Sequence, residues 1–447
     1  MIKTGSKQIR ILFVMLTLSV FIMGWTSENM EECAIIKCMK SAITIANEIS
    51  LEQQVEYEPC TLRFSWWGDE EGNRSMRQAI DAFEDKYPGI QIEIEESFED
   101  GREEILIEQL CAQTAPDINR ISWEWLNQYS EDGSLFYDIY KEYETLNLGS
   151  FGQEYLNLCT VAEELQALPT AVTGQVFLFN ENLFVRAGAD IPQTWKELLK
   201  VGEVFLNQMG EEYYPLALNK TDRMELAIYY LESVYGREWI VNGVPQYGVE
   251  EIEEAMEFLL ELEEMHVIPT IQRMLSKENS DRDSGWSSGC YGGVFVWDEK
   301  TKEYGNMLPS DNHLTVGNGF KNGERVQAGY YKVSTAYAIS ENCANPREAA
   351  LLFDFLFNQE EGVLNLSDTF SVPLSRVARE YGEVQGVFDE TELMANQVGV
   401  GESFPANEYV VAYIENESAY EEVISGLSYG DYNAREAAQL IVDSFDK

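Results

Sequence analysis

The stretch LRFSWWGDEEG, from Leu62 to Gly72, decides the fold. It begins with the apolar alternation of a strand and continues into a turn that contains Gly68. Apolar residues at helical spacing then predict a helix from about Asn73 to Tyr87, and a second alternating strand follows over 90–94. A strand, a helix and a strand in this order predict a parallel pair joined by a helical crossover. We therefore expect an α/β fold.

Polar and aromatic side chains meet where this first strand ends. Trp66, Trp67, Asp69 and Glu70 follow its apolar residues, and open α/β sheets bind ligands beyond the carboxyl ends of their strands. Two indoles beside two carboxylates suit a ligand with apolar CH faces and many hydroxyls, which describes a sugar. The alternative is that one indole belongs to the core and the acids are merely solvated.

A second pair of tryptophans follows the next predicted strand. That strand covers 117–121, and Trp123 and Trp125 come directly after it. Residues two apart in an extended segment share a face, so one of the two indoles is a candidate stacking platform. The alternative is that they plug the core. The loop before the intervening helix carries Asp100, and Asp117 opens the strand. We count both as candidate ligand contacts.

Later segments predict crossings between two halves of the chain. The segment 169–173 contains Pro169 and precedes an apolar strand at 176–180, and the glycine-rich segment 317–323 suits a second crossing. The strand 292–298 repeats the earlier pattern because it ends in Trp297. A further crossing is expected at Pro373.

The size and charge of the chain exclude some partners. The chain has 447 residues, which predicts two or three domains, and its formal net charge is -47. Such a charge repels nucleic acid and anionic lipid. It favours a soluble protein outside the cell, with neutral or cationic ligands easier to accommodate than anionic ones.

The N-terminus has the features of an export signal. Basic residues precede an apolar run over 11–23, which is too short to span a bilayer. We assign 1–27 to a signal peptide, with an uncleaved anchor as the alternative, and 28–60 to an acidic stalk. No cysteine follows the run where a lipid-attachment cysteine belongs.

Cysteine and acid spacings argue against a metal site, and we expect no cofactor. The seven cysteines include no pair separated by two residues, which argues against zinc, and we commit to no disulfide. We expect Cys111, Cys159 and Cys343 to be single buried thiols. The segment from Asp281 to Gly285 lacks the full set of calcium ligands and is interpreted as a surface loop.

Eight short motifs in a fixed order give the chain a family likeness. It resembles the extracellular solute-binding proteins of sugar ABC importers, family 1, which are similar to maltose-binding protein. The matching motifs are FSWWGDE at 64–70, AFEDKYPGI at 82–90, TAPDI at 114–118, LPTAV at 168–172, LFNENLF at 178–184, PQTWKEL at 192–198, YAISEN at 337–342 and NPREAA at 345–350.

The resemblance implies a two-lobed fold of type II, in which each lobe is a sheet flanked by helices and hinge crossings border a cleft. Lobe 1 would comprise 61–168 and 324–372, and lobe 2 would comprise 174–316 and 373–447, with hinges at 169–173 and 317–323. The candidate ligand-binding residues are then Trp66, Trp67, Asp69, Glu70, Asp100, Asp117, Trp123, Trp125, Thr173, Trp297, Tyr330 and Tyr331.

The implied function is capture of a sugar or oligosaccharide and its delivery to a membrane permease. We expect a monomer that is exported to the periplasm or the outer face of the cell membrane, with no catalytic activity. Two alternatives stay open. One is a carbohydrate-active enzyme, since glycosidases also line clefts with tryptophans and carboxylates and Glu124 lies between two tryptophans. The other is an anchored sugar sensor or adhesin.

Overall fold

The computed structural model describes residues 57–97, 101–276, 281–320, 327–366 and 372–445. Internal contacts divide the chain into Met1–Tyr57 and Glu58–Lys447, and the following description concerns the second unit. The predicted signal segment, nearly all of the stalk and Asp100 lie outside the described residues.

The first βαβ unit confirms the prediction made from the Trp-Trp stretch. Strand β1 (Cys60–Trp67) and strand β2 (Ile90–Ser97) are parallel, with Cys60 opposite Ile90. Helix α3 (Glu70–Lys86) joins them and buries Met76, Ile80 and Phe83. The helix begins three residues earlier than predicted because the Asp69 side chain caps its N-terminus.

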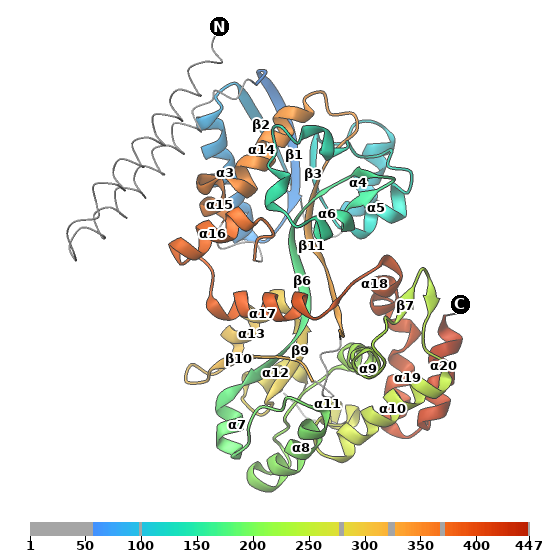
Figure 1. Cartoon of the computed structure of the whole chain (residues 1–447). Helices are drawn as coiled ribbons and strands as arrows, with labels where there is room; N and C mark the ends of the chain where they lie inside the picture. The colour runs from blue at the N-terminus through green and yellow to red at the C-terminus, as the bar shows by residue number, and fades with distance from the viewer. Residues whose placement is uncertain (1–56, 98–100, 277–280, 321–326, 367–371, 446–447) are drawn as a thin grey trace, which may run out of the picture. The chain divides into compact units, whose positions relative to one another are not determined.

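The first lobe is a sheet with helices on both sides (Figure 1). Strand β3 (Ile118–Ile121) is parallel to β1. The other elements are α4 (Arg102–Cys111), α5 (Glu124–Tyr129), η1 (Ile139–Glu142), η2 (Leu148–Ser150), α6 (Gln153–Leu158), β4 (Thr160–Val161), β5 (Glu164–Leu165), α14 (Pro346–Asn358), α15 (Glu360–Leu366) and α16 (Arg376–Gln385). Since α16 contacts α14 and α15, the first lobe continues past the boundary that the sequence predicted at residue 372.

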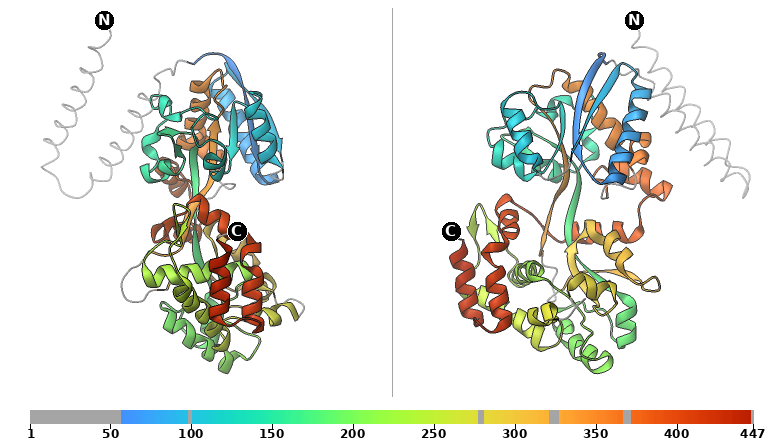
Figure 2. Two further views of the ribbon diagram at one scale, coloured as in Figure 1. Left: turned by 90° about the vertical axis from the view of Figure 1, so that its right-hand side faces the viewer. Right: turned by 180° about the vertical axis from the view of Figure 1, so that it is seen from behind.

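Two long strands connect the lobes, as the views in Figure 2 show. Strand β6 (Leu168–Asn180) pairs over its first half with β11 (Tyr330–Ile339). Its second half pairs with β9 (Gly293–Trp297) and β10 (Leu314–Gly317). The predicted hinge 169–173 lies inside β6. The second crossing is made by β11, which begins after the predicted segment 317–323.

The second lobe surrounds β9, β10 and the end of β6 with helices. These are α7 (Glu181–Ala187), α8 (Trp195–Met209), α9 (Lys220–Tyr235), α10 (Val249–Glu264), α11 (Ile271–Ser276), α12 (Arg282–Ser287), η3 (Asp298–Lys300), α13 (Thr301–Met307), α17 (Glu390–Gly401), α18 (Glu408–Glu415), η4 (Glu417–Ala419), α19 (Glu421–Tyr429) and α20 (Ala434–Ser444). The short strands are β7 (Ile240–Val241), β8 (Val244–Pro245) and β12 (Phe404–Pro405).

Helix α17 packs tightly against the connecting strand β6. A Cβ atom added to Gly174 would lie 2.2 Å from the carbonyl carbon of Gly399 on α17. The absence of a side chain at Gly174 therefore sets the distance between the helix and the strand.

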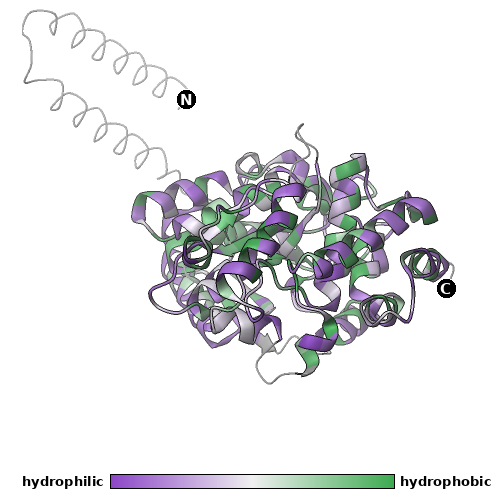
Figure 3. Ribbon diagram, turned by 90° about the horizontal axis from the view of Figure 1, so that it is seen from below, coloured by the Kyte–Doolittle hydropathy of each residue, from purple (hydrophilic) through white to green (hydrophobic). Residues whose placement is uncertain are grey.

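Buried aromatic and aliphatic side chains fill the interior, and hydrophobic and hydrophilic residues alternate along the helices in Figure 3. Trp195 is buried, and its Nε1 donates to Ser233 Oγ at 2.9 Å. Of the three thiols expected in the core, Cys159 and Cys343 are buried but Cys111 is exposed, because it lies on the outer side of the last turn of α4.

Candidate functional site

The two tryptophans that end β1 have different surroundings. Trp66 is 1% exposed, contacts Phe64 at a ring-centroid distance of 4.9 Å, and donates from Nε1 to Asn73 Oδ1 at 2.9 Å. Trp66 is therefore a core residue whose indole N–H is hydrogen-bonded. This agrees with the alternative prediction that one of the two indoles belongs to the core. Trp67 instead lies 5.8 Å from the ring of Trp125.

The acids after β1 serve the start of helix α3. Asp69 is exposed, and its Oδ1 accepts a hydrogen bond from Gly72 N at 2.7 Å. Glu70 is exposed in the first turn, where an acid is favoured by the helix dipole. Helix capping therefore explains Asp69 and Glu70 without a ligand.

The second tryptophan pair lies around the start of α5. Trp125 joins Trp67, and the Arg120 guanidinium lies 4.9 Å from the Trp67 ring. Trp123 is buried, and its Nε1 has no hydrogen-bond partner within the described part of the chain. The structure thus brings one indole of each predicted pair together.

Asp117 lies at the amino end of β3, away from the tryptophans that follow that strand. Its Oδ2 accepts from Arg63 N at 2.9 Å, which fixes the register between β1 and β3. The structure does not bring Asp117 together with the other candidates.

The candidate Thr173 lies on the connecting strand β6 and contacts the segment that follows β9. Thr173 of β6 is fully buried and donates from Oγ1 to Asp298 Oδ1 at 3.0 Å. Asp298 follows Trp297 in the chain and also accepts from Gly174 N at 3.0 Å. Thr173 therefore anchors the backbone beside Trp297, and its own side chain is already used.

Trp297 and Tyr330 line a cavity of about 210 Å³. Its other lining residues are Thr221, Glu225, Lys332, Ala406, Val410, Val411, Ile414, Glu415 and Glu417, which come from α9, β11, the segment before α18, α18 itself and η4. Aliphatic side chains of α18 and the half-buried indole of Trp297 give it apolar surface, and α9 and β11 supply polar groups. Tyr331 points elsewhere, with its ring 6.0 Å from that of Tyr155.

Lys332 connects this cavity with the first lobe. Its Nζ lies 5.3 Å from the Trp297 ring centroid and 3.7 Å from Oε1 of both Glu124 and Glu415. Glu124 begins α5, beside Trp123 and Trp125. Burial raises the pKa of Glu124, and the nearby Lys332 opposes this shift. The two groups of tryptophans are thus linked through Glu124 and Lys332.

Buried carboxyl groups hold the connecting strands at this cavity. Burial raises the pKa of Glu225 and of Glu232 to about 8. Glu232 accepts from the Tyr330 hydroxyl and from Gly329 N, which explains why Tyr330 is fixed. Burial likewise raises the pKa of Asp298 to about 7.

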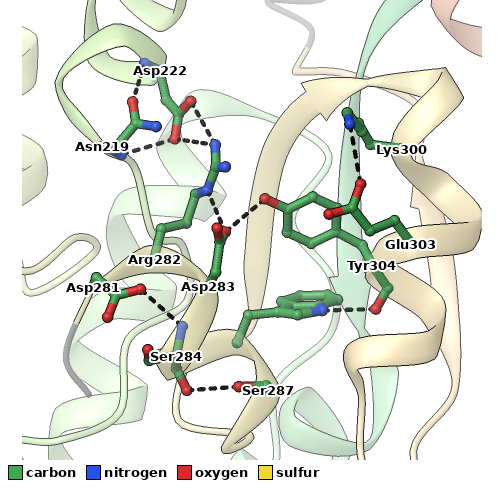
Figure 4. A network of polar contacts seen from close by, with 11 residues as sticks. Asn219, Asp222, Asp281, Arg282, Asp283, Ser284, Ser287, Lys300, Glu303 and Tyr304 are labelled. Carbon is green, nitrogen blue, oxygen red and sulfur yellow. Dashed lines mark hydrogen bonds and ion pairs between the residues drawn. The ribbon is translucent and has the colours of Figure 1, made fainter. Parts of the chain in front are cut away.

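The segment from Asp281 to Gly285 is part of a helix and not the surface loop that the sequence predicted. Asp281 caps α12, and Arg282 contacts Asp222 at 2.8 Å, as Figure 4 shows. Asp283 accepts from the Tyr304 hydroxyl at 2.7 Å. These acids are paired within the protein. No cluster of three or more His, Cys, Asp or Glu side chains suited to a metal occurs among the described residues.

Three parts of the cavity were missed in the sequence analysis. Glu225 stands inside an otherwise ordinary helix, Lys332 follows the tyrosines of β11, and the aliphatic side chains of α18 look like core residues. These side chains can be recognised as cavity residues only because the fold brings them together. A partial signal was the position of Lys332 directly after two candidates.

None of the helices in the described ranges is long and apolar enough to cross a membrane.

Known structures show the same fold. A de novo designed cysteine esterase, an engineered protein, is 26% identical, with a TM-score of 0.80 over 88% of this chain and 98% of its own. A periplasmic oligogalacturonide binding protein from Yersinia enterocolitica, in complex with saturated digalacturonic acid, is 27% identical. Its TM-score is 0.72 over 86% of this chain and 98% of its own. The fold is thus the two-lobed type II fold of periplasmic binding proteins, as expected.

Sequence comparisons agree with this fold. A binding protein of Brucella abortus (strain 2308) is 25% identical over 290 residues, which cover 62% of this chain and 67% of the relative. A family model described as bacterial extracellular solute-binding protein matches residues 78–385. Such proteins are binding proteins of the extracellular or periplasmic space. This chain therefore belongs to the bacterial extracellular solute-binding protein family.

Proposed function

We propose that this chain is the substrate-binding subunit of a carbohydrate ABC importer. The observation that carries the proposal is the cavity at the connecting strands, where the half-buried Trp297 ring is accompanied by aliphatic side chains of α18 and by polar groups of α9 and β11. Indole and aliphatic surfaces suit the CH faces of a sugar. Carboxyl, ammonium and hydroxyl groups suit its hydroxyls.

The structural relative from Yersinia enterocolitica supports a carbohydrate ligand, because it was found with saturated digalacturonic acid. Membership of the solute-binding family supports the importer role. In this proposal the protein acts as a monomer outside the cell membrane and delivers its ligand to a permease.

Capture would occur by rotation of the lobes about β6 and β11. A ligand favours the closed arrangement only if it contacts both lobes, and Lys332, Glu124 and Trp297 already meet at this place. A micromolar dissociation constant requires about 8 kcal/mol. Each neutral hydrogen bond contributes about 1 kcal/mol, so several polar contacts are needed in addition to the apolar surface.

Isothermal titration against a panel of oligosaccharides tests the proposal. We expect at least one saccharide to bind, and Trp297→Ala to weaken that binding about 10-fold or more, because ring contacts and buried area are lost. The control is Tyr143→Ala, since Tyr143 is an exposed aromatic residue outside the cavity. Unchanged affinity in Trp297→Ala would remove this residue from the site, and a panel with no binding saccharide would refute the proposal.

A further inference from the structure

The ammonium group of Lys332 lies at the cavity and forms two long ion pairs. Among the described residues, its carboxylate partners are Glu124 and Glu415, each with an oxygen 3.7 Å away, whereas a direct hydrogen bond between an amine and an oxygen is about 2.7–3.2 Å. Glu415 is 64% exposed and can exchange this contact for water at little cost. Lys332 therefore has donor capacity left for a ligand.

Glu225 is a buried acid with one oxygen left for a ligand. Glu225 is 7% exposed and lines the cavity. Oε2 accepts from Gln175 Nε2 at 3.1 Å, and this is its single hydrogen bond within the described ranges. Gln175 in turn accepts from Tyr330 N at 3.0 Å, so the acid is fixed from the side of the connecting strands. Its Oε1 has no hydrogen-bond partner among the residues that the structure describes.

The surroundings of Glu225 keep it protonated at neutral pH. Burial is the main cause that raises its pKa to about 8, and Asp222 adds to the shift. The Gln175 hydrogen bond, Lys332 and Arg282 act in the opposite direction.

The other titratable groups around Glu225 are Glu415, Glu417 and Tyr330 in the cavity wall and Tyr420 nearby. At pH 7 the neutral Glu225 therefore carries a hydroxyl that can donate. Together with the Lys332 ammonium, it gives the cavity two hydrogen-bond donors.

We infer that Glu225 and Lys332 bind the carboxylate of an acidic saccharide whose ring lies against Trp297. A carboxylate offers two acceptor oxygens and no donor, which matches two donors in the wall. This inference rests on the proposed function and names its substrate class. Negative charges far from the cavity do not oppose it strongly, because solvent-exposed charges more than about 8 Å apart are largely screened at physiological salt. The carboxylates of Glu124 and Glu415 lie within that range, and both are paired with Lys332.

The wild-type protein provides the first test. Isothermal titration at pH 7 compares digalacturonate with the α-1,4-linked disaccharide of galactose, in which CH2OH replaces each carboxylate. We expect digalacturonate to bind about 10-fold more tightly or better, since hydrogen bonds to charged groups are the stronger ones. Equal or tighter binding of the neutral disaccharide would overturn the inference and leave the proposed function standing. If no saccharide of any kind binds, both fail.

Variants then assign the effect to the two residues. Lys332→Gln should weaken digalacturonate binding about 10-fold or more and change binding of the neutral disaccharide less than about 3-fold. Lys220→Gln is the matched control, because Lys220 pairs with Glu421 outside the cavity. An equal loss for both disaccharides in Lys332→Gln would contradict a role in recognising charge.

The pH dependence separates Glu225 from a merely structural acid. Digalacturonate binding to the wild type should weaken as pH rises from 7 to 9, because Glu225 loses the proton that it donates. Glu225→Gln keeps a donor and should bind with little dependence on pH in this range, whereas Glu225→Ala should bind weakly throughout. A wild-type affinity that does not change with pH would overturn the role of Glu225. This measurement uses the wild-type protein alone, so it does not depend on whether a variant folds.

Discussion

The folded protein holds protons on three buried carboxyl groups that the unfolded chain would release. These groups belong to Glu225, Glu232 and Asp298. Their pKa values are raised to about 8, 8 and 7, whereas unfolded Glu and Asp titrate near 4. Between these values the folded state holds more protons, so the free energy of unfolding falls as pH rises. The stability that these acids contribute is present at low pH and lost as pH approaches 8.

Glu225→Gln should flatten this dependence. Each such group adds a slope of up to about 1.4 kcal/mol per pH unit between its two pKa values, and glutamine cannot ionise. Urea unfolding at pH 6, 7 and 8 measures the slope, with Glu257→Gln as the control because Glu257 is exposed on α10. Parallel slopes in wild type and Glu225→Gln would contradict the burial argument.

The tryptophans show which properties of a single residue can be predicted from the sequence. Trp66 and Trp67 are adjacent and look equivalent in the sequence, but one bonds Asn73 inside the core and the other meets Trp125. Trp297 was singled out because it ends a strand, and the structure places it at a cavity. Position in a strand could be predicted. Which indole has a free face depends on contacts between distant segments.

At the scale of elements, periodicity predicted the helices and strands well. The pattern over 73–87 and 90–94 predicted α3 and β2. The start of α3 was misplaced because the cap at Asp69 resembles a ligand-binding acid, and β2 continues beyond 94 to Ser97. Strand β6 was seen as a hinge followed by a short strand. Its continuity could not be predicted, since it depends on pairing with β9, β10 and β11 at once.

The packing of α17 against β6 can be tested with one methyl group. Gly174→Ala places a Cβ 2.2 Å from the Gly399 carbonyl carbon and 2.3 Å from its oxygen, so the helix must move. We expect the free energy of unfolding to fall by about 1–3 kcal/mol, measured by urea denaturation. Gly401→Ala is the matched control, because it lies in the same helix and its added Cβ meets nothing within 4 Å. If both variants are equally stable, the close approach does not limit the packing.

At the scale of the whole molecule, the formal net charge of -47 opposes the compact state through repulsion among its acids. Salt screens this repulsion. We expect the melting temperature at pH 7 to rise by about 2–5 °C between 10 and 300 mM sodium chloride. The increase should shrink near pH 4.2, the isoelectric point of the sequence. An equal increase at both pH values would point to a general salt effect and contradict the electrostatic one.

Because a single strand belongs to both sheets, neither half of the protein is a transplantable module. A gene fragment that ends inside β6 would lack β11, which lies between β6 and β3, and would therefore leave β3 with an unpaired edge. The chain also returns to the first half through β11 and α14 before it finishes in the second. Evolution can therefore alter specificity in this architecture by replacing loops and side chains around the shared strand, but recombination of whole halves would require cutting the chain at several places together.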